Sequence, residues 1–201
     1  MKIAARWILV PVVVSLAVLF SMTVGLPVAQ GQAAHVRWDI ISVNFATGAL
    51  SPGGVAAALA NDGSKIVLTG SGTFVAPAGG DGTSSATTGG GNWQTFNASN
   101  VSTGNGTYEV TGLVRWEKAP GTTSGPDLIG NPAERSAGLA VLRIEYSDGK
   151  HGILVVSCRL GGTPGTVFEG ITASKGFADY FNRVAPVPGV NANRTLFHVQ
   201  D

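Results

Sequence analysis

The stretch that decides the fold consists of two strand-like runs and the turn between them: Gly138-Leu-Ala-Val-Leu-Arg-Ile-Glu-Tyr146, Ser147-Asp-Gly-Lys150 and His151-Gly-Ile-Leu-Val-Val-Ser-Cys-Arg-Leu160. The Asp-Gly pair predicts a tight β-hairpin, because both residues tolerate a positive φ. The predicted register sets Ser147 opposite Lys150. Tyr146 then pairs with His151. Both faces of the hairpin are largely apolar, so we expect it to lie in the middle of a sheet.

Other segments with strand character surround this hairpin. Residues 106–118 alternate between apolar and polar side chains, which is typical of a half-buried strand. Gly112 lies on the apolar row and indicates a β-bulge or a close backbone approach. Further strands are expected at residues 36–45, 65–75, 93–96, 167–173 and 195–199.

Helix is expected to be scarce. The Ala-rich segment 52–61 predicts one or two helical turns that end at the turn signal Asn61-Asp-Gly63. Phe177, Tyr180 and Phe181 have helical spacing and are interpreted as a hydrophobic plug over one end of the core.

Two long loops are also expected. Residues 76–106 are rich in Gly, Ser and Thr, which bury too little apolar surface to offset their ordering entropy, so we expect a mobile loop region around a short strand. Residues 122–132 form the second loop.

These segments predict an all-β protein of about eight strands, with long Gly/Ser/Thr loops and little helix. The architecture is expected to be a single-domain antiparallel β-sandwich or a closed β-barrel, and both remain open. No internal repeat of fixed period occurs, which argues against a propeller or a solenoid.

The first 33 residues follow the secretory signal-peptide pattern. Lys2 and Arg6 precede an uncharged run over residues 8–24, and small residues follow as far as Ala34. We expect export with cleavage after Ala33, leaving an all-β domain over residues 34–201. The alternative is an uncleaved membrane anchor, although the run is at the short edge of what spans a bilayer.

The composition excludes several classes of protein. Lys and Arg number 13, Asp and Glu number 12, and only 12% of residues are charged. A nucleic-acid binder would show a basic excess, so nucleic acid is not an expected partner. A single cysteine excludes an intramolecular disulfide framework, and Cys158 is expected to be buried and unreactive. Glycosylation sequons begin at Asn97, Asn100, Asn105 and Asn193.

One pattern recurs in three predicted strands, in which an arginine and an acid stand two positions apart: Arg37-Trp-Asp39, Arg115-Trp-Glu117 and Arg143-Ile-Glu145. In a strand, the two charged side chains share one face and the residue between them faces the core. On neighbouring strands these pairs would form a ladder of charges over a solvated outer face. The functional alternative is a partly enclosed charged cavity that holds one polar ligand.

The candidate binding residues come from this pattern and from the hairpin end: Arg37, Asp39, Arg115, Glu117, Arg143, Glu145, Tyr146 and His151. No catalytic residue and no cofactor is predicted. No metal site is predicted either, because His35, His151 and His198 share no ligand spacing.

We therefore expect a non-catalytic β-fold binding or envelope-associated module, secreted or held in the cell envelope. Its partner would be a small molecule, a glycan or a protein. One alternative is a small secreted β-fold enzyme acting on carbohydrate, with Glu145, Arg143 and His151 as the first residues to test. The other is a structural protein anchored in the membrane by residues 8–24.

Overall fold

The computed structural model describes residues 33–77 and 82–200. The predicted signal peptide therefore lies, except for Ala33, outside the described residues. Within these two ranges we find no helix with the length and apolarity needed to cross a bilayer.

The described residues are almost entirely strands, which confirms the all-β prediction. Thirteen strands join one sheet system, and the only helical element described is a short 3₁₀ turn. The elements are β1 (Ala34–Asn44), β2 (Ala49–Pro52), β3 (Ala56–Leu59), β4 (Lys65–Leu68), β5 (Ser71–Ala76), β6 (Thr87–Phe96), β7 (Ser102–Ala119), η1 (Pro132–Glu134), β8 (Arg135–Tyr146), β9 (His151–Cys158), β10 (Gly170–Lys175), β11 (Ala178–Tyr180), β12 (Asn182–Arg183) and β13 (Thr195–Gln200).

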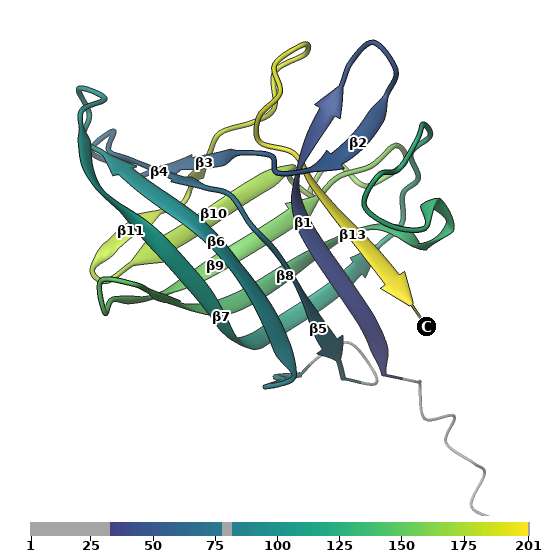
Figure 1. The fold of residues 1–201 in the computed structure, drawn as a ribbon, viewed down its shortest axis with the longest axis horizontal. Coiled ribbons are helices and arrows are strands. Elements are labelled where there is room, and N and C mark those ends of the chain that lie inside the picture. Colours follow the sequence, from purple (N-terminus) through teal and green to yellow (C-terminus); the bar gives the residue numbers. More distant parts are fainter. Residues whose placement is uncertain (1–32, 78–81, 201) are drawn as a thin grey trace, which may run out of the picture. The chain divides into compact units, whose positions relative to one another are not determined.

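Six strands close an antiparallel barrel. Their order is β1-β5-β6-β7-β8-β13, and β13 pairs with β1 to complete the ring (Figure 1). The remaining strands extend this barrel: β9, β10 and β11 continue from β8, β4, β3 and β12 continue from β6, and β2 pairs with β1. Of the two expected architectures, the sandwich and the closed barrel, the closed barrel forms. Its closure leaves these six strands without a free edge.

Aromatic rings fill the barrel interior. The ring of Trp116 lies 5.5 Å from that of Phe74 and 4.6 Å from that of Phe197, measured between centroids. These residues belong to strands that are not neighbours in the barrel, so the contacts cross its axis. Trp38 is fully buried in the same core. Because these rings fill this section of the interior, a ligand site here lies on the outer surface of the barrel.

A second aromatic group lies where β6, β7 and β8 run on past the barrel towards β10. Trp93 and Tyr146 meet edge to face at 5.8 Å. The ammonium group of the buried Lys175 lies 4.0 Å from the Trp93 ring centroid and pairs with Asp148. The Tyr146 hydroxyl donates to the main-chain oxygen of Ser174 at 2.8 Å, so this polar tip is satisfied inside the core.

The β8–β9 hairpin forms as predicted, but its register is shifted by one residue. His151 lies opposite Glu145 and not opposite Tyr146. The cause is a three-residue loop in place of a two-residue one: the Tyr146 amide donates to the Lys150 oxygen, and Gly149 takes a φ of 79°. This is the arrangement of a turn followed by a bulge, and one extra residue moves every cross-strand pair.

The predicted helical segments are strands or turns instead. Residues 56–59 form β3, which pairs with β4, so the helix expected over 52–61 is wrong, while the turn at Asn61-Asp-Gly63 is present. Tyr180 is buried at the end of β11, whereas Phe177 is 100% exposed and Phe181 is 57% exposed. The hydrophobic plug is therefore wrong, because Phe177 lies in the turn between β10 and β11 and Phe181 lies just after β11, and both side chains face solvent.

Much of the expected loop over residues 76–106 is also strand. The glycines at 89–91 lie in β6, which pairs with β4, β5 and β7, whereas residues 78–81 of the expected loop lie outside the described residues. A Cβ atom at Gly91 would stand 2.0 Å from the main-chain oxygen of Thr69. These glycines allow adjacent backbones to approach closely, and they do not mark a flexible linker here.

Several local predictions are confirmed. The register of β7 against β8 shifts between Val110 and Gly112, which is the expected bulge. Cys158 is fully buried, and Trp38, Trp116 and Ile144 are buried between the charged residues of their strands.

Asn193 is also buried, and its side-chain oxygen accepts the Ala57 amide at 2.7 Å, so this sequon is poorly placed for a glycan.

The hairpin turn supplies a stability test. Gly149→Val should lower the free energy of unfolding by about 1–3 kcal/mol, because a β-branched residue is strained at a φ of 79°. Gly149→Asn should cost clearly less, since Asn tolerates the left-handed region. Urea unfolding measures both, and equal stability of the two variants would contradict the turn.

Candidate functional site

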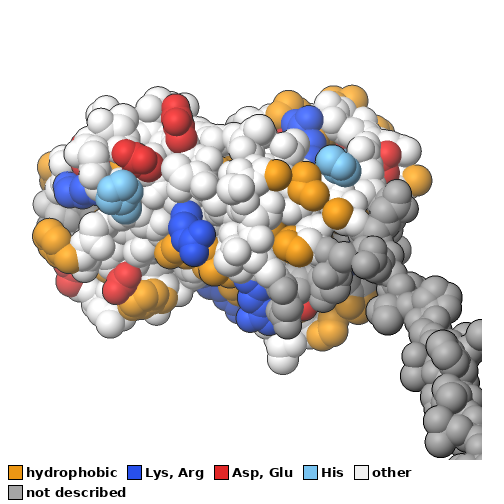
Figure 2. Space-filling view, turned by 90° about the horizontal axis from the view of Figure 1, so that it is seen from below, with side chains coloured by type: hydrophobic (Ala, Val, Ile, Leu, Met, Phe, Trp, Pro, Cys, Tyr) orange, Lys and Arg blue, Asp and Glu red, His pale blue; other side chains and the backbone are white. Residues whose placement is uncertain are grey.

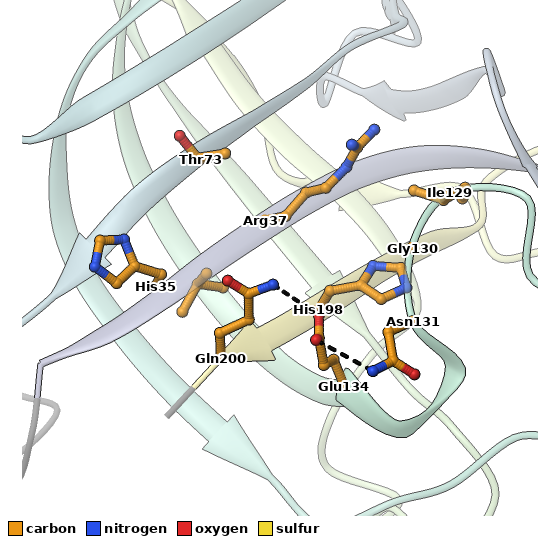
Figure 3. A pocket seen from close by; sticks show the side chains of 10 residues that line it. His35, Arg37, Thr73, Ile129, Gly130, Asn131, Glu134, His198 and Gln200 are labelled. Atoms are coloured by element: carbon orange, nitrogen blue, oxygen red, sulfur yellow. Dashed lines mark hydrogen bonds between the residues drawn. The ribbon is translucent and has the colours of Figure 1, made fainter.

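A cleft lies on the outer face of β5, β1 and β13, beside the segment that joins β7 to β8 (Figure 3). Its volume is about 400 Å³. Polar and apolar atoms contribute about equally to its surface, and it is lined by His35, Val36, Arg37, Thr73, Ile129, Gly130, Asn131, Glu134, His198 and Gln200. We refer to this site as the β1–β13 cleft.

Strand alternation and register place the polar side chains of the cleft. Val36 and Trp38 face the core, so Arg37 between them faces outward. Arg37 lies opposite Thr73 on β5 and opposite His198 on β13. His198 in turn lies opposite Arg135 on β8. A row of polar side chains therefore crosses four adjacent strands.

The buried carboxylate of Asp127 holds the covering segment against this row. Arg135 donates to it through Nε at 2.6 Å, and His198 Nε2 lies 3.0 Å from the same oxygen. The other oxygen accepts the main-chain amides of Ile129 and Gly130. The side chains of Asp127, Arg135 and His198 are 0%, 4% and 3% exposed. We call these three residues the Asp127 clamp.

Arg135 fixes the segment at two further points. Its guanidinium group donates to the main-chain oxygens of Thr123 and Gly125, at 3.2 Å and 2.8 Å. Burial disfavours the charge on Asp127, but the hydrogen bonds from Arg135, His198 and two amides outweigh it and hold the pKa of Asp127 well below its usual range. The clamp therefore contains an ion pair that is fully charged near neutral pH.

A second ion pair lies at the base of the cleft. Arg37 donates to both oxygens of Asp39, at 2.8 Å and 2.9 Å. The Asp39 side chain is buried, while Arg37 remains 41% exposed towards the cleft. This two-point contact fixes the orientation of the guanidinium plane and neutralises its charge.

The rim of the cleft is a small network of amides around one carboxylate. Glu134 accepts a hydrogen bond from Asn131 at 3.3 Å through one oxygen and from Gln200 at 3.1 Å through the other (Figure 3). Asn131 also caps η1 by accepting the Ala133 amide. The rim therefore presents donors and acceptors whose positions are already fixed.

No family model, curated protein or solved structure matches this chain. Its site has to be interpreted from its own geometry. Among the described residues, no group of three or more His, Cys, Asp and Glu side chains is placed to hold a metal ion.

Of the eight binding candidates predicted from the sequence, two belong to this site. Arg37 lines the cleft, and Asp39 anchors it from below. Arg115 and Glu117 form an exposed ion pair of 3.0 Å on β7. Arg143, Glu145 and His151 are exposed on the β8–β9 hairpin.

Tyr146 is a core residue, and burial raises its pKa well above the usual range.

The expected ladder of three charged pairs does not form. β1 is separated from β8 by β13, and it pairs with neither β7 nor β8. On β7 and β8 themselves, two bulges set Arg143 opposite Gly112 and Arg115 opposite Val141. The two arginine–acid pairs on these strands therefore lie at different heights along the sheet.

The sequence does not predict a binding role for five further residues of the site: Asp127, Asn131, Glu134, His198 and Gln200. Asp127, Asn131 and Glu134 follow β7 in a stretch without periodicity, so no pattern marks them. His198 lies on a predicted strand, but only the pairing of β13 with β1 and β8 brings it beside Asp127.

Removing the clamp carboxylate should destabilise the protein strongly. Asp127→Ala leaves the Arg135 guanidinium buried without its partner, and we expect a loss of about 3–5 kcal/mol in the free energy of unfolding. Glu117→Ala removes the carboxylate of an exposed ion pair and should change it by about 0.5 kcal/mol or less. Chemical denaturation of both variants measures the difference, and equal effects would show that the clamp does not hold the segment.

The same carboxylate should shape stability at acid pH. Its pKa is lower in the folded chain than the ordinary value near 3.8, so its contribution is present above pH 4 and is lost as the pH falls below that value. The free energy of unfolding should therefore drop steeply from pH 4 to pH 2. Asp127→Asn should flatten this slope, and an unchanged slope in the variant would assign the acid sensitivity to other groups.

Proposed function

We propose that the chain is an exported, non-catalytic binding module and that the β1–β13 cleft binds a neutral, polyhydroxylated molecule of the saccharide class. The observation that carries this proposal is the internal compensation of charge at the cleft. Arg37 is neutralised by Asp39, and Arg135 by Asp127. What remains for a ligand is a set of oriented hydrogen-bonding groups and the single negative charge of the Glu134 carboxylate.

Hydroxyl groups suit these side chains because each hydroxyl both donates and accepts. Glu134 offers acceptor oxygens, Gln200 and Asn131 offer amides, and Arg37 offers guanidinium donors. Their mutual hydrogen bonds order them before a ligand arrives, which lowers the entropic cost of binding. A strongly anionic ligand is disfavoured by the Glu134 carboxylate on the rim.

Charge across the surface supports a partner of this kind. On the face seen in Figure 2, acidic and basic side chains are few and are interspersed among uncharged ones. Such a surface gives little long-range steering towards a polyanion. The signal-peptide pattern of residues 1–33 supports a place outside the cytoplasm.

The enzyme alternative has one observation in its favour, the contact between Asp127 and His198. A catalytic histidine also needs a nucleophile or a substrate at its second ring nitrogen. Nδ1 of His198 is buried and has no hydrogen-bond partner among the described residues. Arg135 shares the same carboxylate oxygen, which suits a structural clamp better than an acid–base pair.

The proposal is tested on a glycan array carrying neutral and anionic oligosaccharides, with the secreted protein after its mass has been measured under native and denaturing conditions. We expect binding to neutral glycans. The double variant Glu134→Ala/Gln200→Ala should weaken it about tenfold or more, which corresponds to the loss of one or two hydrogen bonds of about 1 kcal/mol each.

Glu145→Ala is the matched control, because it removes an exposed carboxylate on the β8–β9 hairpin and should leave binding unchanged. Binding restricted to anionic glycans, or equal binding by the double variant, would contradict the proposal. Cleavage of a bound glycan would favour the enzyme alternative. Protein found only in membranes, with residues 8–24 retained, would favour the anchored structural protein.

A further inference from the structure

A second pocket lies on another part of the barrel, where β9 ends and β13 begins. Its volume is about 270 Å³, and a neighbouring hollow of about 420 Å³ shares Arg159, Glu169 and Arg194 with it. We call the smaller space the Glu169 pocket. One side of it is charged and the other is apolar, unlike the β1–β13 cleft.

Glu169 closes the charged side. It lies just before β10, and its two carboxylate oxygens accept the main-chain amides of Arg159 and Thr195, the latter at 2.6 Å. The Thr195 hydroxyl lies 3.3 Å from the same oxygen and donates to the Ser157 carbonyl at 2.6 Å. This carboxyl group is therefore held firmly between the two strand ends.

Two guanidinium groups share this side of the pocket. Arg159 is exposed, and Arg194 is half-buried, with its guanidinium carbon 5.3 Å from the Phe45 ring centroid. Nε of Arg194 is buried and has no hydrogen-bond partner among the described residues. A buried donor without a partner is costly, so an acceptor from a ligand would stabilise it.

The opposite side of the pocket is a wall of aliphatic side chains. Val43 and Leu160 are its partly exposed members, and the buried side chains of Ile41, Leu50 and Leu196 lie behind them. Main-chain hydrogen bonds between Thr122 and Gly161, at 2.9 Å in both directions, hold the segment after β7 against the end of β9. The wall is therefore formed without a ligand.

We propose that the Glu169 pocket binds a small amphipathic carboxylic acid, whose carboxylate pairs with Arg159 and Arg194 and whose apolar tail packs against the aliphatic wall. Two guanidinium groups recognise a carboxylate by paired, charge-assisted hydrogen bonds. An apolar tail gains by leaving water for the wall. Neither an inorganic anion nor an uncharged alcohol uses both sides of the pocket.

Glu169 makes this binding dependent on pH. Burial raises the pKa of Glu169 to about 7, against the hydrogen bonds from Arg159 and Thr195 and the charge on Arg194. The ionisable groups that face it are Arg159, Arg194 and the buried thiol of Cys158. Above pH 7 a charged Glu169 repels the ligand carboxylate, and below pH 7 its protonation removes that repulsion.

The test is calorimetric titration of the secreted protein with hexanoate in carboxylate-free buffer at pH 6 and pH 8. We expect saturable binding that is about three- to tenfold tighter at pH 6, a range that corresponds to coupling of up to about one pKa unit. Acetate, 1-hexanol and inorganic phosphate should each bind at least about tenfold more weakly, since each lacks the tail or the carboxylate.

Variants separate the two halves of the proposal. Arg159→Ala should weaken hexanoate binding about tenfold, in line with the loss of one charge-assisted hydrogen bond, while Arg143→Ala, an exposed arginine on β8, should not change it. Glu169→Gln should bind equally well at both pH values, provided that its thermal unfolding shows a folded protein. A variant that unfolds is replaced by Arg159→Ala measured at both pH values, where the pH effect should remain.

Three results would overturn the proposal. They are no saturable binding of hexanoate at millimolar concentration, binding of phosphate or acetate as tight as that of hexanoate, and equal effects of the two arginine variants. Equal affinity of the unaltered protein for hexanoate at pH 6 and pH 8 would show that Glu169 does not make binding depend on pH. None of these results bears on glycan binding at the β1–β13 cleft.

Discussion

The buried ion pair between Asp127 and Arg135 is the interaction on which both candidate sites depend. A charge removed from water is tolerated only when partners compensate it, and here the carboxylate has two side chains and two amides around it. The segment after β7 has few apolar residues to hold it down, so this pairing takes the place of a hydrophobic contact. Its residues then line the β1–β13 cleft on one side and the Glu169 pocket on the other.

The barrel explains why both sites lie on its outside. Rings that meet across the axis leave that part of the interior to Trp38, Phe74, Trp116 and Phe197. A closed sheet of this kind is a rigid base, and polar side chains on its outer face are fixed by register alone. The connections between strands then supply the walls. A rigid barrel whose connecting segments form the binding sites is a common arrangement among β-folds.

The sequence predicts the parts of this fold that rest on local rules. Alternation identifies β7 and the inward tryptophans, and the Asp-Gly pair identifies the central hairpin. Prediction from the sequence fails where a contact between distant segments determines the local structure. The glycines of β6 predict a flexible loop when only the local sequence is considered. Their role is to let the backbones of β5, β7 and the β4–β5 connection approach closely, and that contact depends on other strands. Within the site, only Arg37 and Asp39 belong to a recognisable sequence pattern, the arginine and acid two positions apart. Asp127 and His198 are 71 residues apart, and only barrel closure joins them.

The shared wall raises the question of whether the two pockets communicate. Coupling between sites requires an element with two arrangements, each favoured by a different ligand. Thr123 and Ser124 face the Glu169 pocket, and Asn131 and Glu134 face the β1–β13 cleft, but the clamp lies between them and neither proposed ligand touches its carboxylate. The clamp touches both walls, because His198 lines the β1–β13 cleft and Arg135 donates to the Thr123 oxygen. Four hydrogen bonds to the Asp127 carboxylate hold it in one arrangement. The geometry therefore favours two independent sites, because a clamp held at this many points resists the second arrangement that coupling requires.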